Sequence, residues 1–129
     1  MERVDFTKDV TNMIFRGAEA GIENMQSSCF FTYEEELATD YAEMNDNPCL
    51  YAFDISGLKL MEVERNEDLD FGIGWISEED YSQYDGVRTE SYSQAVFFGE
   101  FDCKTGKFTK CTYEEVIKQA ESEIRRYDR

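Results

Sequence analysis

The sequence predicts an α+β domain in which short strands surround two main amphipathic helices. Apolar and aromatic runs bounded by turn residues are typical of strands, and the clearest of them covers residues 49–55. Two Thr-x-x-Glu capping boxes, which begin at Thr32 and Thr112, each precede apolar residues at helical spacing. The 129 residues contain no repeat and no linker, so a single domain is expected over residues 1–129.

The first half of the chain alternates between expected strands and helices. Strands are predicted at 10–16, ending at Gly17, and at 29–31, with a short helical stretch at 18–25 between them. The first capping box, Thr32 with Glu35, begins a helix over 33–44. Its apolar face is expected to consist of Leu37, Ala38, Tyr41, Ala42 and Met44. Strands at 49–55 and 58–63 follow, joined by a turn at Ser56-Gly57.

The second half begins with a polar, glycine-containing stretch, 64–93, which predicts loop mixed with short helix. Within it Ser77 is expected to cap a helical turn over 78–81. A strand at 94–98, extending to 101, leads through a hairpin at Thr105-Gly106 into a strand at 107–111. The second capping box then begins a last helix with one apolar face, made of Tyr113, Val116, Ile117, Ala120, Ile124 and Tyr127.

Acidic residues dominate the charge. There are 29 of them against 13 basic residues, and the formal net charge is −16 with no histidine. Residues 17–102 hold 21 acids and three bases, a net charge of −18. This excess argues against direct contact with nucleic acid, because phosphate contacts require a basic face. It is explained either by a solvated surface or by a surface that docks on a basic protein partner, such as a nucleic-acid-binding host protein.

The remaining composition narrows the class of protein. No apolar run approaches the roughly 20 residues of a membrane span, and the N-terminus lacks the apolar region of a signal peptide, so a cytoplasmic protein without membrane contact is expected. The four cysteines, Cys29, Cys49, Cys103 and Cys111, form no Cys-x-x-Cys pair, and no histidine is available to complete a zinc site. They are expected to be free thiols without a metal.

Several short motifs occur in a definite order. They are Phe15-Arg16-Gly17, Phe30-Phe31-Thr32, Leu37-Ala38 with Tyr41-Ala42, Tyr51-Ala52-Phe53-Asp54-Ile55, Asp85-Gly86-Val87 and Gln94-Ala95-Val96-Phe97-Phe98. This order resembles that of small members of the ADP-ribosyltransferase-like superfamily, over roughly residues 13–98. The resemblance implies a split, mostly antiparallel sheet with an NAD cleft between its halves.

The resemblance also implies roles for individual residues. Arg16, followed by Gly17, matches the first-strand residue that meets the NAD phosphate or ribose. Thr32 matches a hydroxyl residue that shapes the nicotinamide pocket, and Phe31 or Tyr41 would stack on the nicotinamide ring. Because NAD carries an anionic diphosphate, the acidic chain requires local positive potential in the cleft. Arg16 and Arg88, two isolated bases, are the candidates to supply it.

The catalytic position departs from the family pattern. Breaking the bond between nicotinamide and ribose builds positive oxocarbenium character, which a nearby carboxylate stabilises. The family's glutamate opens the last motif strand, where this chain has Gln94. Glu90, four residues earlier, or Glu100, on the same expected strand, would have to substitute. Otherwise the pocket binds NAD or a related nucleotide without turnover, or binds nothing.

Each of these residues also has a purely structural explanation. Arg16-Gly17 is equally explained as a strand end with a turn glycine, and Thr32 as a helix N-cap. The pairs Phe30-Phe31 and Phe97-Phe98 are typical of a core.

Two functions therefore stand side by side. One is an NAD-dependent ADP-ribosyltransferase-like protein that modifies a host or partner protein. The other is a non-enzymatic acidic inhibitor or adaptor that mimics nucleic acid and blocks a basic surface, as anti-defence proteins of phages and mobile elements do.

Overall fold

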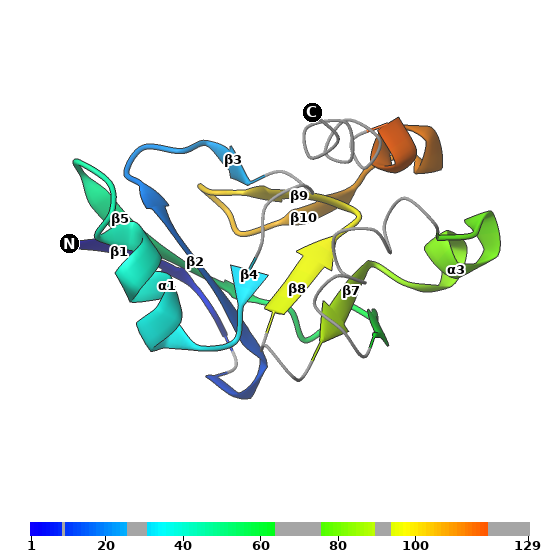
Figure 1. Cartoon of the computed structure of the whole chain (residues 1–129), viewed down its shortest axis with the longest axis horizontal. Coiled ribbons are helices and arrows are strands. Elements are labelled where there is room, and N and C mark those ends of the chain that lie inside the picture. The colour runs from blue at the N-terminus through cyan, green and yellow to red at the C-terminus, as the bar shows by residue number, and fades with distance from the viewer. Residues whose placement is uncertain (9, 26–30, 64–75, 90–93, 119–129) are drawn as a thin grey trace, which may run out of the picture.

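The computed structural model describes residues 1–8, 10–25, 31–63, 76–89 and 94–118 (Figure 1). The strands are β1 (Glu2–Phe6), β2 (Met13–Glu19), β3 (Asn24–Met25), β4 (Phe31–Thr32), β5 (Pro48–Asp54), β6 (Leu60–Glu62), β7 (Gly86–Thr89), β8 (Gln94–Phe97), β9 (Gly99–Asp102) and β10 (Phe108–Lys110). The helices are the 3-10 turn η1 (Val10–Asn12), α1 (Glu35–Ala42) and α3 (Glu78–Gln83), and residues 113–118 are also helical. The predicted α+β class is confirmed.

The strands form two sheets. The larger has the order β1-β5-β2-β4-β8-β7-β6, and the smaller has the order β10-β9-β3. Pairing is antiparallel except at the two edges of the larger sheet, where β1 runs parallel to β5 and β6 runs parallel to β7. In the middle of that sheet β2 pairs with β4, and within the described residues Phe15 lies in register with Thr32. Strand β4 thus connects the half of the sheet that contains β2 to the half that contains β8.

An aromatic core fills the space between the two sheets. Phe31 lies edge-on to Phe97, with ring centroids 5.2 Å apart, and Phe53 stacks on Phe101 of the smaller sheet at 4.7 Å. All four rings are at most 1% exposed. Burying rings of this size supplies a large share of the stabilisation of a small domain. The expectation that Phe31 and Phe97 are core residues is confirmed.

Helix α1 covers the other face of the larger sheet, over β2 and β5 (Figure 1). Its buried residues are the two alanines Ala38 and Ala42, so the helix backbone comes very close to the strands. A Cβ added at Gly17 would lie 1.8 Å from the carbonyl oxygen of Ala38 and 2.5 Å from the amide nitrogen of Ala42. Glycine is required at position 17 because only a hydrogen atom fits beneath the helix.

Several boundaries differ from the sequence-based predictions. The stretch 18–25, predicted to be helical, contains the end of β2 and the strand β3, and β2 continues through Gly17 rather than ending there. The predicted strand at 94–101 is two strands in different sheets, β8 and β9. Strand β1 was not predicted at all. Sheet pairing decides each case, because these short strands are stabilised by partners far away in the sequence.

The two capping boxes have different outcomes. At Thr112 the prediction is confirmed: its Oγ1 accepts a hydrogen bond from the amide of Glu115 at 3.2 Å. At Thr32 it is wrong, because Thr32 is paired within the sheet and α1 begins later, with Glu34 as an N-cap that makes no side-chain cap bond. Ser77 caps α3 as predicted, accepting from the amide of Asp80.

Within the described residues, no helix has the length and apolar character needed to cross a membrane.

The close approach at Gly17 yields a stability prediction. Gly17→Ala is expected to lower the free energy of unfolding by about 1–3 kcal/mol or more, because the added methyl group overlaps helix backbone that cannot rotate away. Gly57→Ala is the matched control, since no atom lies within 4 Å of its added Cβ. Urea unfolding of both variants measures the difference. Equal stability of the two variants would contradict the packing of α1 on β2.

Candidate functional site

A pocket of about 550 Å³ lies where α1 faces β2, β4 and β8. Four consecutive residues of β2, at 15–18, line it. Successive strand residues point to opposite faces of a sheet, so a pocket that contacts four of them in a row lies along the edge of β2 and not over one face alone. The lining residues are Phe15, Arg16, Gly17, Ala18, Phe31, Thr32, Ala38, Tyr41, Met44, Asn45 and Gln94.

Six of the nine residues predicted to form a site line this pocket. They are Arg16, Gly17, Phe31, Thr32, Tyr41 and Gln94. The chain brings them from four elements spread over almost 80 positions of sequence. That convergence is a property of the fold, and it could not be read from any one motif.

The lining has a charge unlike that of the rest of the protein. Arg16 is basic and, among the lining residues that the structure describes, none is acidic, although 29 of the 129 residues of the chain are. Arg16 is half-buried on β2, in register with Tyr51 of β5. The positive charge of Arg16, with no acid among the described lining residues, favours an anionic ligand over a cationic one.

A row of polar side chains crosses the sheet beside the pocket. Thr32 of β4 pairs with Gln94 of β8, and Gln94 pairs in turn with Thr89 of β7. Paired residues of antiparallel strands point to the same face, so Gln94 lies between two hydroxyl groups. The Thr32 Oγ1 accepts a hydrogen bond from the amide of Glu34 at 3.0 Å. Thr89 is fully buried, and its hydroxyl has no hydrogen-bond partner in the described part of the chain.

The two aromatic candidates for stacking differ in exposure. Phe31 is 1% exposed and belongs to the aromatic core, so it offers little surface to a ligand. Tyr41 is 49% exposed and Met44 is 79% exposed, both at the pocket. The sequence pattern placed both on the buried face of the helix, but the alanines alone fill the space between α1 and the sheet. Tyr41 is therefore the better placed of the two aromatic residues to stack on a bound ring.

The three remaining predicted residues do not line the pocket or are not described. Arg88 lies on β7, where it forms a 3.0 Å ion pair with Glu62 and lies 5.1 Å from the centroid of the Tyr33 ring. Glu100 lies on β9, in the smaller sheet, and is not among the residues that line the pocket. Glu90 falls outside the described residues. A binding role for Arg88 and a catalytic role for Glu100 thus find no geometric support here.

Five residues line the pocket without having been predicted as site residues. Phe15, Ala18 and Ala38 contribute apolar surface, while Met44 and Asn45 follow the last turn of α1. The Asn45 side-chain amide donates to the carbonyl oxygens of Tyr41 and Ala42, both at 3.2 Å, and so closes the end of the helix. Its position after an amphipathic helix was a usable sequence signal for a cap, but not for a pocket.

The thiols and carboxylates show no metal cluster. Among the described residues no group of three or more metal-binding side chains is close enough to hold an ion. Cys49 and Cys111 are free thiols, Cys103 is buried, and Cys29 lies outside the described residues. Burial is the main reason that the pKa values of Cys49 and Cys111 lie above their ordinary range.

The comparisons with known proteins add no relative. No protein-family model matches the chain, and no curated protein or solved structure matches it either.

The turn after β2, next to the pocket, is held by the hydroxyl group of Tyr51. This hydroxyl donates to the carbonyl oxygen of Glu19 at 2.9 Å and accepts from the amide of Ile22 at 3.2 Å. Burial is the main cause that raises the pKa of Tyr51 from 10.0 to about 12. The folded protein therefore holds this proton more tightly than the unfolded chain does.

A mutation and a pH series test the contribution of the Tyr51 hydroxyl group to stability. Tyr51→Phe is expected to lower the free energy of unfolding by about 1–3 kcal/mol, because two buried backbone groups lose their partner. Because the pKa of Tyr51 is raised in the folded protein, the protonated side chain stabilises the fold fully below about pH 10, and this stabilisation is lost as the pH rises toward about 12. The difference in free energy of unfolding between the wild type and Tyr51→Phe should therefore narrow over that range. Tyr41→Phe, at a half-exposed position, is the control and should change stability little. A difference in free energy of unfolding that stays constant with pH would contradict the raised pKa of Tyr51.

Proposed function

We propose that this pocket binds NAD and that the protein is ADP-ribosyltransferase-like, acting on a partner protein. The observation that carries the proposal is the convergence of Arg16, Thr32 and Gln94. These are the three positions that the resemblance assigns to an NAD cleft, they lie on strands β2, β4 and β8, and these strands are neighbours in the sheet. The mostly antiparallel larger sheet, with β2 and β4 side by side, is compatible with the sheet of that superfamily.

The chemistry of the lining supports the same ligand. An NAD diphosphate is anionic, and the pocket presents Arg16 and no described acid. Tyr41 offers an exposed ring face for stacking. Bound NAD would supply the ADP-ribosyl group, and the residues of this chain would bind and orient it. Gln94, flanked by Thr32 and Thr89, provides amide hydrogen bonds at the position where the superfamily has a glutamate.

Binding is tested with two arginine variants. Arg16→Ala is expected to weaken NAD binding by about tenfold or more, because a charge-assisted contact to phosphate is lost. Arg88→Ala is the matched control: its side chain pairs with Glu62 away from the pocket, so NAD affinity should change by less than about twofold. Isothermal titration calorimetry measures both, with circular dichroism as a check on folding. NAD affinity that is equal in the wild type and in both variants would overturn the assignment.

Transfer is tested by restoring the superfamily's glutamate. Gln94→Glu places a carboxylate in a pocket that has none among its described lining residues, and one well-placed electrostatic group contributes about 10²–10³ in rate. Labelled NAD incubated with cell lysate should therefore give more transfer with this variant than with the wild type. Glu100→Gln should leave transfer unchanged, while Glu90→Gln tests the carboxylate that lies outside the described residues.

The outcomes of this assay separate binding from turnover. More transfer by Gln94→Glu supports a pocket of transferase geometry. An unchanged or lower rate, with NAD affinity intact, would show that the pocket binds the nucleotide without the geometry for transfer.

A second function, that of an acidic adaptor, is favoured by the outer face of α1. Glu34, Glu35, Glu36, Asp40 and Glu43 are all exposed there, and the chain has no basic residue from 17 to 58. Such a surface fits a basic protein partner and would increase the association rate by electrostatic steering.

The adaptor function makes a kinetic prediction. The rate of association with a basic partner should fall steeply as ionic strength rises to about 0.15 M, where charges are screened within about 8 Å, while the dissociation rate changes less. The double variant Glu36→Lys with Asp40→Lys should slow association, and Lys104→Ala, remote from α1, should not. Surface plasmon resonance over a salt series measures these rates. An association rate independent of salt would assign the acidic face to solvation alone.

A further inference from the structure

Strand β1 lies at one edge of the larger sheet and carries opposite charges at the two residues next to its central residue. Among the described strands it pairs only with β5. Its sequence is Glu2-Arg3-Val4-Asp5-Phe6, with opposite charges on either side of Val4. Charged side chains commonly protect an edge strand from unselective pairing. In β1 the charges at positions 3 and 5 have opposite signs, so they attract a neighbouring strand only in a register that places Arg3 opposite an acid and Asp5 opposite a base.

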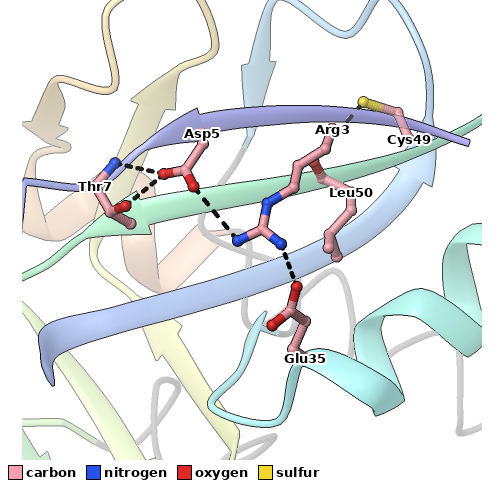
Figure 2. Close-up of polar contacts among 6 residues, drawn as sticks. All are labelled: Arg3, Asp5, Thr7, Glu35, Cys49 and Leu50. Carbon is pink, nitrogen blue, oxygen red and sulfur yellow. Dashed lines mark hydrogen bonds and ion pairs between the residues drawn. The ribbon is translucent and has the colours of Figure 1, made fainter. Parts of the chain in front are cut away.

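The strand is held firmly from within its own chain. Phe6 stacks on Phe53 of the core, with ring centroids 5.5 Å apart. Figure 2 shows Arg3 between Asp5, at 3.3 Å, and Glu35 at the start of α1, with which it forms a second ion pair. Thr7 donates to Asp5 through its amide at 2.9 Å, and its hydroxyl also bonds this carboxylate. These hydrogen bonds are the main cause that lowers the pKa of Asp5. The side chains of Arg3 and Asp5 are thus held on the face of the sheet that carries α1.

We propose that β1 pairs antiparallel with β1 of a second copy of this chain, about a two-fold axis at Val4. In this register Arg3 of each copy lies opposite Asp5 of the other, and Val4 lies opposite itself. A two-fold axis perpendicular to the sheet keeps both charged pairs on one face, where directly opposed side chains lie about 4.5–5.5 Å apart. The two larger sheets then form one continuous sheet.

The contact is small, so the dimer is weak and reversible. A five-residue strand pair buries less than the roughly 1,200 Å² that is typical of stable interfaces. Each copy carries a net charge of −16, which opposes association at low ionic strength. The dimer should therefore form at high protein concentration and be favoured by moderate salt. This inference does not depend on NAD binding.

Charge exchange between two variants tests the register. Arg3→Asp alone and Asp5→Arg alone each replace both attractive pairs by repulsive ones, so each should reduce self-association by about tenfold or more. An equimolar mixture of the two variants restores two opposite-charge pairs and should associate as strongly as the wild type. Sedimentation velocity up to millimolar concentration, at about 0.15 M salt, measures all four samples. A monomeric wild type, or a mixture no stronger than the single variants, would overturn the proposal.

A cysteine cross-link provides a test that does not rely on these charges. Val4→Cys places a thiol next to its own copy on the two-fold axis, within the distance that a disulfide spans. Glu2→Cys is the control, because four residues of stagger separate it from its own copy by about 13 Å. Under mild oxidation only Val4→Cys should give a dimer cross-linked through position 4, identified by peptide mass mapping. Equal cross-linking at both positions, or none at position 4, would contradict the register.

Discussion

The packing of α1 directly on Gly17 is the constraint on which the rest of this structure depends. Two small helix residues, Ala38 and Ala42, and one glycine allow helix backbone and strand backbone to touch. A larger residue at any of these positions would lift the helix from the sheet. Because α1 lies this low over β2, its last turn and the edge of β2 enclose the pocket instead of leaving a flat surface.

The same arrangement separates the charges of the protein. The acids of α1 are exposed, and one of them, Glu35, pairs with Arg3, while the described lining of the pocket at the edge of β2 contains Arg16 and no acid. An acidic protein can therefore offer an anionic ligand an acceptable site, because the repelling charges are directed toward solvent. Two arginines outside the pocket are paired with acids: Arg88 with Glu62, and Arg3 with Asp5 and Glu35.

The sequence predicted the fold class, the main helix and the central strands, because these depend on local periodicity and turn residues. It also identified six residues that line one pocket, through the order of motifs that carry them. It missed β1, although Arg3-Val4-Asp5-Phe6 alternates polar and apolar residues as a strand does. This strand is short, and it is stabilised by parallel pairing with β5, more than 40 residues away. It did not predict the structural surroundings of Thr32, Tyr41 and Arg88. The pairing of Thr32, the exposure of Tyr41 and the partner of Arg88 are each decided by elements distant in sequence.

The most direct test of the central claim is to map NAD binding by nuclear magnetic resonance on the isotope-labelled protein. If the pocket beneath α1 is the site, the amide signals of Gly17, Thr32, Tyr41 and Gln94 should shift together and saturate with one dissociation constant. Signals from β10 and α3, which contribute no lining residue, should stay in place. Shifts centred on those remote elements, or no shift at millimolar NAD, would contradict the account.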